Sequence, residues 1–315
     1  MRLLVVDHNA LEPSARRVYD AMVGYGGIEL CLMVPSRWHN NFHLLQFQAP
    51  TDAPAYELVA SDVFFPTRTH RLIYRALARH VARFQPDVLY MNAEPENFQT
   101  FQAARLCAAG QRKLVFSSWR NIDHVREGYP YKGESLHRAI EKYVLKRAVH
   151  GIVFNRQAKA IFALHGYDAT TVIPPPVDTN VFFPREPQAR ATHRFTVGFA
   201  GRFIEGKGLD LLLHALAQLP PEFAAVLVGA GPEETRLRQL AGKLGLAGRV
   251  EFLSPLEPRR LAECMCTWDA VVLPSRTTPY WREQFGRILA EAMACGIPVI
   301  GSSSGEIPHV IADAG

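Results

Sequence analysis

The sequence predicts an α/β protein with two domains, each built on an open, doubly wound parallel sheet. Short runs of β-branched and aliphatic residues alternate with amphipathic helical stretches along the chain. A proline-rich stretch at 172–184 interrupts this alternation, and a polar run leads to about Arg194 before the pattern restarts. The length of 315 residues also suits about two domains. We therefore expect one domain over residues 1–184 and a second over residues 185–315.

The first domain is expected to alternate strands with helices. Short apolar runs predict buried strands at Leu3–Val6, Glu29–Val34, Val88–Met91, Leu114–Ser117 and Gly151–Phe154. Apolar residues at helical spacing predict helices at Pro13–Met22, His70–Phe84, Asn97–Ala108 and Leu136–Ala148. Parallel strands need long crossover connections, which are usually helices, so this alternation indicates a parallel sheet.

The second domain repeats the pattern. Strands are expected at Phe195–Phe199, Ala224–Val228, Val250–Leu253, Ala270–Leu273 and Val299–Ile300. Helices are expected at Leu209–Leu219, Glu233–Leu244, Pro258–Cys266 and Arg287–Ala294. Such sheets bind ligands at the carboxyl ends of their strands, so we expect a ligand cleft between the two domains.

Composition favours a cytoplasmic protein. The chain is 48% hydrophobic, but no run approaches the roughly 18 apolar residues of a membrane span. Its first residues, Met1 to Asp7, indicate a strand rather than a signal peptide. The five cysteines are odd in number and fit no zinc-ligand spacing, so we expect reduced thiols.

The net charge of +5 lies entirely in the first half of the chain. Residues 1–187 hold 22 Lys and Arg against 17 Asp and Glu, whereas the remainder holds 13 of each. This asymmetry indicates an anionic partner for the first domain, such as a membrane surface or a phosphorylated acceptor.

Two basic ladders at helical spacing stand out in that half. The first is Arg71, Arg75, Arg79 and Arg83, and the second is Arg138, Lys142 and Lys146. They suit peripheral contact with the inner face of a membrane, but a sheet-packing helix with a solvated basic face is the favoured interpretation. Nucleic acid is not expected as a partner, because the ladders lack interleaved aromatic residues.

Two glutamates define the strongest motif of the second domain. Glu283 precedes a helix that Gly286 opens and Gly296 closes, and Glu291 lies inside it. A helix N-terminus offers free N–H groups and partial positive charge to an anion, which the two carboxylates would flank. Taken alone, the pair is more simply interpreted as solvated surface glutamates.

A glycine-rich loop adds cations to this picture. Gly201-Arg202 leaves a predicted strand, and Lys207-Gly208 precedes a predicted helix, which together form an anion cradle. A second glycine turn, at 228–232, is followed by Glu234 where a dinucleotide-binding fingerprint needs glycine. We therefore interpret that turn as a capped helix start, and an NAD-dependent dehydrogenase is the weakest alternative.

Together these motifs resemble the retaining glycosyltransferases of family 4, which have the GT-B fold of two Rossmann-like domains facing across a cleft. The resemblance covers nearly all of residues 170–315 and is diffuse in residues 1–170. It rests on Gly201-Arg202, Lys207-Gly208, Val228-Gly-Ala-Gly-Pro232, Val250-Glu-Phe-Leu253, Leu273-Pro-Ser275, Glu283 to Val299 and Gly301-Ser-Ser-Ser-Gly-Glu306.

This resemblance implies roles for individual residues. Arg202 and Lys207 would bind the donor diphosphate and stabilise the leaving group, while Glu283 would hold the donor sugar's hydroxyl groups. Glu291 would accept hydrogen bonds from the ribose. The remaining donor contacts would be Gly201, the backbone N–H groups of Phe285 and Gly286, and, beside the base, Phe252 and Leu253.

The chain departs from the family pattern in four places. The loop at Asp7–Ser14 lacks the usual glycine pair, and Asn121 or His124 stands where the family often has a histidine. Pro175-Pro-Val-Asp178 replaces the usual interdomain Asn-Gly-Val-Asp. Relatives continue beyond Gly315, so we expect a fragment or an incomplete second domain. No two aspartates lie two residues apart, so no metal cofactor is expected.

The first hypothesis is therefore a metal-independent retaining transferase that uses a UDP- or GDP-sugar. Its acceptor would be a glycan, a lipid-linked molecule or a small molecule. Two alternatives remain: an inactive nucleotide-sugar-binding or scaffold protein, and a GT-B epimerase or hydrolase. The sugar, the base and the acceptor depend on side-chain geometry that residue spacing does not fix.

Overall fold

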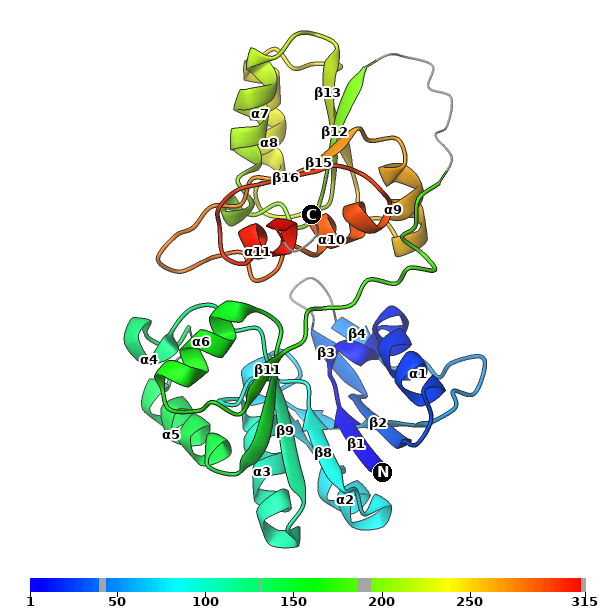
Figure 1. Cartoon of the computed structure of the whole chain (residues 1–315), viewed down its shortest axis with the longest axis vertical. Coiled ribbons are helices and arrows are strands. Elements are labelled where there is room, and N and C mark those ends of the chain that lie inside the picture. Colours follow the sequence, from blue (N-terminus) through cyan, green and yellow to red (C-terminus); the bar gives the residue numbers. More distant parts are fainter. Residues whose placement is uncertain (40–43, 131, 186–193, 313–315) are drawn as a thin grey trace. The chain divides into compact units, whose positions relative to one another are not determined.

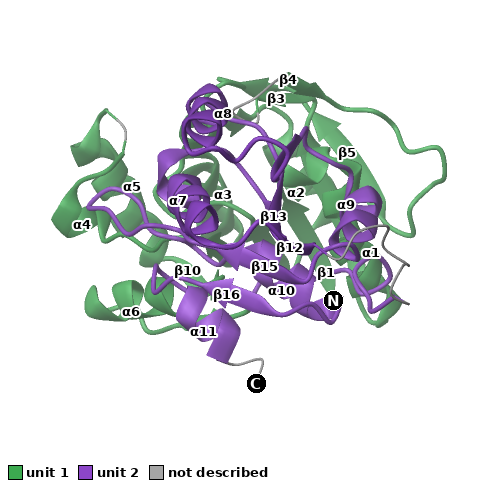
Figure 2. Ribbon diagram, turned by 90° about the horizontal axis from the view of Figure 1, so that it is seen from above, with its two compact units in different colours: residues 1–173 green, residues 174–315 purple. Residues whose placement is uncertain are grey.

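The computed structural model describes residues 1–39, 44–130, 132–185 and 194–312 and contains two compact units (Figure 1). The units are Met1–Ile173 and Pro174–Gly315, coloured separately in Figure 2. Residues 174–184, expected in the first domain, belong to the second, because Val181 and Phe182 are buried in its core. Most of the polar run before Arg194, and the chain end after Ala312, lie outside the described residues.

The first unit contains a seven-stranded sheet in the order β11-β10-β9-β8-β1-β2-β5, with every neighbouring pair parallel. The predicted strands are confirmed as β1 (Arg2–Val6), β2 (Glu29–Pro35), β8 (Val88–Met91), β9 (Lys113–Ser118) and β10 (Ala148–Val153). The two outermost strands, β5 (Glu57–Ser61) and β11 (Thr170–Val172), were not predicted. Edge strands are less buried and therefore carry a weaker apolar signal.

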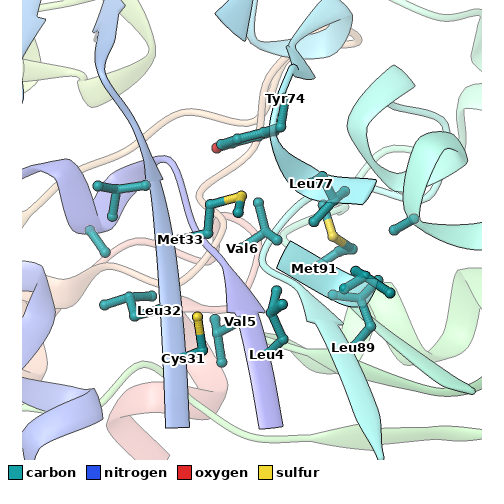
Figure 3. Close-up of a cluster of buried hydrophobic side chains, with 14 of the residues drawn as sticks. Leu4, Val5, Val6, Cys31, Leu32, Met33, Tyr74, Leu77, Leu89 and Met91 are labelled. Atoms are coloured by element: carbon teal, nitrogen blue, oxygen red, sulfur yellow. The ribbon is translucent and has the colours of Figure 1, made fainter. Parts of the chain in front are cut away.

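Six α-helices accompany this sheet within the described residues: α1 (Arg17–Gly24), α2 (Leu77–Phe84), α3 (Phe98–Gly110), α4 (His124–Glu127), α5 (Glu134–Leu145) and α6 (Arg156–Leu164). The core lies around the central strands β1, β2 and β8 (Figure 3). Leu4, Leu32, Met33, Leu89 and Met91 have no exposed surface there. Burial on both faces explains why these strands have continuous apolar sequences.

The helix predicted at His70–Phe84 is wrong in its first half. The chain instead forms a 3₁₀ turn at Thr69–Arg71 and a strand, β7 (Ile73–Tyr74), antiparallel to β6 (Val63–Phe64). The Tyr74 N–H donates to the Gln102 side chain at 3.0 Å, and the Gln102 amide donates back to the Tyr74 carbonyl at 2.8 Å. These tertiary hydrogen bonds fix an extended backbone where the local pattern favours a helix.

This correction removes the first basic ladder. Because α2 begins at Leu77, only Arg79 and Arg83 lie on that helix, while Arg71 lies in the 3₁₀ turn. The guanidinium of Arg75 lies 5.4 Å above the ring of Phe64, on the β6–β7 hairpin. The four arginines therefore do not form one helical face, and the membrane contact inferred from them loses its basis.

The second unit contains a five-stranded parallel sheet in the order β14-β13-β12-β15-β16. Its strands are β12 (Phe195–Ala200), β13 (Phe223–Val228), β14 (Val250–Leu253), β15 (Ala270–Leu273) and β16 (Val299–Gly301). Its helices are α7 (Leu209–Gln218), α8 (Glu234–Lys243), α9 (Pro258–Met265), α10 (Arg287–Ala294) and α11 (Ile307–Ala312). The chain winds outward from β12 to β14, then restarts at β15 on the other side of β12, so the topological switch point lies between β12 and β15.

The fold class is thus confirmed: both units are doubly wound sheets of Rossmann-like strand order. All five cysteines are free thiols. Among the helices that the structure describes, none combines the length and the hydropathy needed to cross a bilayer.

Candidate functional site

The candidate site of the second unit lies at the switch point between β12 and β15. The loop after β12 runs from Gly201 to a 3₁₀ turn at Glu205–Lys207, and the loop after β15 runs from Pro274 to Gly286. The two loops touch directly, since the Arg276 N–H donates to the Gly206 carbonyl at 2.8 Å. Ligands of doubly wound sheets bind at this position.

Gly208 makes the close approach of these loops possible. Its φ is +65°, and a Cβ there would lie 2.2 Å from the carbonyl oxygen of Pro274. Any side chain would therefore push the loops apart. A second link joins the same segments, because Arg276 Nη2 lies 2.7 Å from Asp210 Oδ2 at the start of α7.

The predicted residues Lys207 and Glu283 meet at this junction. Lys207 Nζ donates to Glu283 Oε2 at 2.6 Å, and the Ser275 hydroxyl donates to the same oxygen at 2.7 Å. Glu283 is buried, with 6% of its surface exposed. Both donors engage Oε2, so the arrangement fixes the carboxylate while Oε1 is bonded by neither of them.

Ser304 holds the backbone of the loop after β15, and sequence reasoning missed it. Its hydroxyl donates to the Arg276 carbonyl at 3.0 Å and accepts from the Thr277 hydroxyl at 3.0 Å and the Glu283 N–H at 3.3 Å. Ser304 is 3% exposed. Its serine-rich segment is part of the family resemblance, and this was the only sequence signal for a role of Ser304. Residue spacing alone does not indicate which of the three serine hydroxyls is buried.

Glu291 lies on α10, the helix that Gly286 opens with a φ of +88°. Its side chain is largely buried, and Arg287 Nη2 lies 3.4 Å from its Oε1. Burial raises the pKa of Glu291 above its ordinary value, and the nearby Arg287 offsets only part of that effect. Phe285, just before the helix, is also buried. The first N–H groups of α10 have no acceptor within the helix and suit an anionic ligand.

The remaining candidate donor-binding residues follow or end strands of the second sheet and have different environments. Arg202 follows Gly201 and is exposed. Phe252 and Leu253 form the end of β14, two strands away from β12. The Arg238 guanidinium lies 4.5 Å above the Phe252 ring, which already covers one face of that ring. A base beside Phe252 would therefore meet its other face, its edge or the backbone.

The first-domain candidates Asn121 and His124 follow β9 at the carboxyl edge of the first sheet. Asn121 is buried, and His124 begins α4, whose N-cap Asp123 accepts from the Val125 N–H at 3.1 Å. His124 Nδ1 lies 3.5 Å from Glu96 Oε1. The histidine therefore faces a buried charge cluster that sequence reasoning did not identify.

That cluster is centred on Arg120, which is 3% exposed. Its guanidinium lies 2.7 Å from Glu96 Oε2 and 2.5 Å from Glu141 Oε1. Burial would raise the pKa of Glu96, but Arg120 and His124 outweigh it and hold that pKa well below its ordinary value. Two carboxylates thus share one fully buried guanidinium.

Glu94 lies beside this cluster, and its pKa is shifted in the opposite direction from that of Glu96. It accepts from the Ser118 hydroxyl at 2.6 Å and from the Trp119 N–H at 2.7 Å. Burial raises the pKa of Glu94, and the neighbouring charge of Glu96 raises it further. Adjacent carboxyls are therefore driven toward different protonation states.

No cluster of three or more His, Cys, Asp or Glu residues suited to a metal ion occurs in the part of the chain that the structure describes.

Two protein-family models together match nearly the whole chain. The model described as "Glycosyltransferase Family 4" matches residues 42–181, and the model described as "Glycosyl transferases group 1" matches residues 182–315. The junction of the two matches falls close to the boundary between the compact units.

Curated relatives match about half of the chain. The chain is 34% identical over 183 residues to the D-inositol 3-phosphate glycosyltransferase of Corynebacterium jeikeium, which covers 51% of this chain and 42% of the relative. It is 36% identical over 171 residues to the enzyme of that name from Mycolicibacterium smegmatis, covering 50% of this chain and 38% of the relative. The match thus spans less than half of either relative.

Solved structures match the fold over almost the entire chain. Anabaena HepE in complex with UDP and glucose has a TM-score of 0.71 at 22% identity, covering 98% of this chain and 82% of HepE. Sucrose-phosphate synthase from Thermosynechococcus elongatus has a TM-score of 0.72 at 19% identity, covering 98% and 83% of the two chains.

Proposed function

Because the chain belongs to the family 4 glycosyltransferases and has the GT-B fold, we propose that it transfers a sugar from a nucleoside diphosphate sugar to an acceptor, with retention of anomeric configuration and without a metal. The donor is a UDP- or GDP-sugar, and the acceptor is a glycan, a lipid-linked molecule or a small molecule. UDP and UDP-glucose occupy the structures of the similar protein HepE, which favours uridine as the base.

The observation that carries this proposal is the contact between Lys207 and Glu283 at the switch point of the second sheet. A cation that neutralises a departing diphosphate lowers the barrier to breaking the bond between the sugar and the phosphate. In our proposal Lys207 supplies that charge, together with the exposed Arg202. Glu283 Oε1 accepts a hydrogen bond from the donor sugar, and Glu291 accepts from the ribose.

Retention follows most simply if the acceptor enters on the face that the diphosphate leaves. The bond between the anomeric carbon and the phosphate oxygen breaks, a bond to the acceptor oxygen forms, and the acceptor proton passes to the leaving phosphate. This route needs no protein nucleophile. Glu283 suits the orienting role better than attack, because Lys207 and Ser275 already hold one of its oxygens.

We further propose a cytoplasmic location, where nucleoside diphosphate sugars would be available. The five free thiols support a reducing compartment.

A thermal-shift screen with UDP, GDP, ADP and CMP, with and without EDTA, tests the donor site. A ligand that binds the folded protein raises its melting temperature by mass action. We expect one diphosphate to stabilise the protein equally in both conditions. NMR of the product formed from the matching sugar donor then reports the anomeric configuration. Loss of stabilisation in EDTA would overturn the metal-independent mechanism, and free sugar as the sole product with every acceptor would indicate a hydrolase.

A further inference from the structure

Trp281 lies in the loop after β15 and packs against the loop after β12. It is partly buried and is the last residue of a tight turn, in which the Thr278 N–H donates to the Trp281 carbonyl at 2.8 Å. Its neighbour Tyr280 points into solvent and is 87% exposed. The two adjacent aromatic residues therefore occupy very different environments.

The Trp281 ring covers the 3₁₀ turn that carries Lys207. A Cβ on Gly206 would lie 2.6 Å from the ring atoms Cδ2 and Cε3. The indole thus lies directly against the Gly206 backbone, at a distance that only glycine permits. Lys207 Nζ lies 5.6 Å from the centroid of the same ring, within the range in which an aromatic face attracts an ammonium group.

The ring and Glu283 approach Lys207 as parts of one loop. Trp281 lies two residues before Glu283, and the loop is fixed to the turn by the hydrogen bond from Arg276 N–H to the Gly206 carbonyl. Lysine has a flexible four-carbon side chain and loses substantial conformational entropy when it is held in one rotamer. The ion pair to Glu283 fixes the amine, and the packed ring fixes the backbone turn from which the side chain starts.

From this geometry we propose that Trp281 is a positioning residue for the donor diphosphate: it holds the Glu205–Lys207 turn so that the Lys207 ammonium is aligned before the donor binds. The proposal rests on the proposed function, because it assigns Lys207 to the diphosphate. Preorganised charge is more effective than charge that must be ordered on binding. The effect of Trp281 should therefore depend on the number of phosphates in the ligand.

The test compares the affinities of UDP and UMP by calorimetric titration of Trp281→Ala, Trp281→Phe and the wild type. The two ligands share the base, the ribose and the first phosphate. We expect Trp281→Ala to weaken UDP binding by about tenfold and to change UMP binding by less than about twofold. Trp281→Phe keeps an aromatic face and should restore most of the preference for UDP. Tyr280→Ala, the exposed neighbour, is the matched control and should change neither affinity.

If Trp281 had a merely structural role, Trp281→Ala would reduce the affinities for UDP and UMP equally. That outcome, or unchanged UDP binding in Trp281→Ala, would overturn the proposal while leaving the proposed function intact. Failure of the wild type to bind either UDP or GDP would overturn the proposed function, and this inference with it. If the screen selects guanine, the same comparison uses GDP and GMP. If Trp281→Ala does not melt cooperatively, Trp281→Leu replaces it, because leucine fills space without an aromatic face.

Gly206→Ala provides an independent check. The φ of Gly206 is not positive, so alanine strains the backbone little, but its Cβ would displace the ring. We expect the same selective loss of UDP affinity. In the Trp281→Ala background the second substitution should add little, because contacting residues are energetically coupled. Additive losses in the double variant would contradict the proposed contact.

Discussion

The ammonium of Lys207 contacts the carboxylate of Glu283 at 2.6 Å, although the two residues are 76 positions apart. Both side chains are largely buried, with 14% and 8% of their surfaces exposed. A buried ion pair stabilises a fold only when its geometry is good and the remaining polar atoms are satisfied. Here the pair fixes the relative position of two loops, which is a structural function whether or not a ligand is bound.

Removing either donor contact should weaken nucleotide binding. We expect Lys207→Ala and Glu291→Ala each to reduce the affinity for the preferred nucleoside diphosphate at least about tenfold, or about 1.4 kcal/mol. Isothermal titration measures this directly. Lys243→Ala, an exposed lysine at the end of α8, is the control for the loss of one positive charge. Unchanged affinity in either test variant would refute the assignment of that residue.

The two glutamates should respond differently to substitution. Glu283→Gln keeps an oxygen that accepts from Lys207, so nucleotide affinity should change by less than about threefold, while turnover should fall at least about tenfold. Steady-state kinetics with a sugar donor, alongside titration with the free nucleotide, separates these effects. Abolished nucleotide binding in this variant would mean that the roles given to Glu283 and Glu291 are exchanged.

Nucleotide affinity should fall on mild acidification. The folded-state pKa of Glu291 is raised, so its carboxylate is protonated at a higher pH than an ordinary glutamate would be. A group with a raised folded pKa stabilises the fold below its unfolded pKa and loses that contribution as the pH rises through the folded value. Binding has the opposite sign, because only the ionised carboxylate accepts freely from ribose hydroxyl groups. Titrations between about pH 8 and about pH 5 should show a decline in the wild type and a flatter profile in Glu291→Gln.

The buried cluster of the first unit should matter for stability rather than for nucleotide affinity. Arg120→Ala leaves Glu96 and Glu141 buried without their shared cation, which should destabilise the fold by about 3–5 kcal/mol. Thermal denaturation measures the effect, with the exposed Arg105→Ala as the matched control. If the variant melts like the wild type, water or a rearranged side chain must already compensate the two carboxylates.

Loss of the Ser304 hydroxyl should disturb the loop after β15 without unfolding the second unit. Ser304→Ala removes one donor and one acceptor that serve Arg276, Thr277 and Glu283, at an expected cost of about 1–3 kcal/mol. Ser302→Ala is a useful comparison, since its hydroxyl donates to the neighbouring Ser275 carbonyl at 2.5 Å. Hydrogen exchange of the backbone at 276–283 should increase in Ser304→Ala, and an unchanged exchange pattern would count against this role.

Strong local patterns made most of the fold predictable. Strands β1 and β2 are buried and apolar after their first residue, so their positions followed from the apolar runs. Their parallel orientation followed from the alternation of strands with helices. The failures have tertiary causes. Gln102 holds Tyr74 in a strand through two hydrogen bonds. The sequence near Tyr74 does not indicate a hydrogen-bonding partner 28 positions away.

The site shows the same division. Glycine spacing and charged residues at predicted strand ends indicated where Lys207 and Glu283 would lie, and the fold brings them together. Spacing did not indicate that Ser304 and Trp281 support them, because serine and tryptophan are common in loops and in cores. The buried Arg120 cluster was equally hidden, since each of its charges has an ordinary surface interpretation until all are enclosed together.

The position of Gly305 has a consequence for the shape of the loop that carries Glu283. A Cβ at this glycine would lie 1.8 Å from the Glu283 carbonyl oxygen, and the Glu306 N–H donates to that same oxygen at 3.1 Å. The turn before α11 thus packs directly against the backbone of Glu283 and fixes the conformation of its loop. A protein cut after β16 would retain Arg202, Lys207, Glu283 and Glu291, yet the surface against which their loop is shaped would be gone.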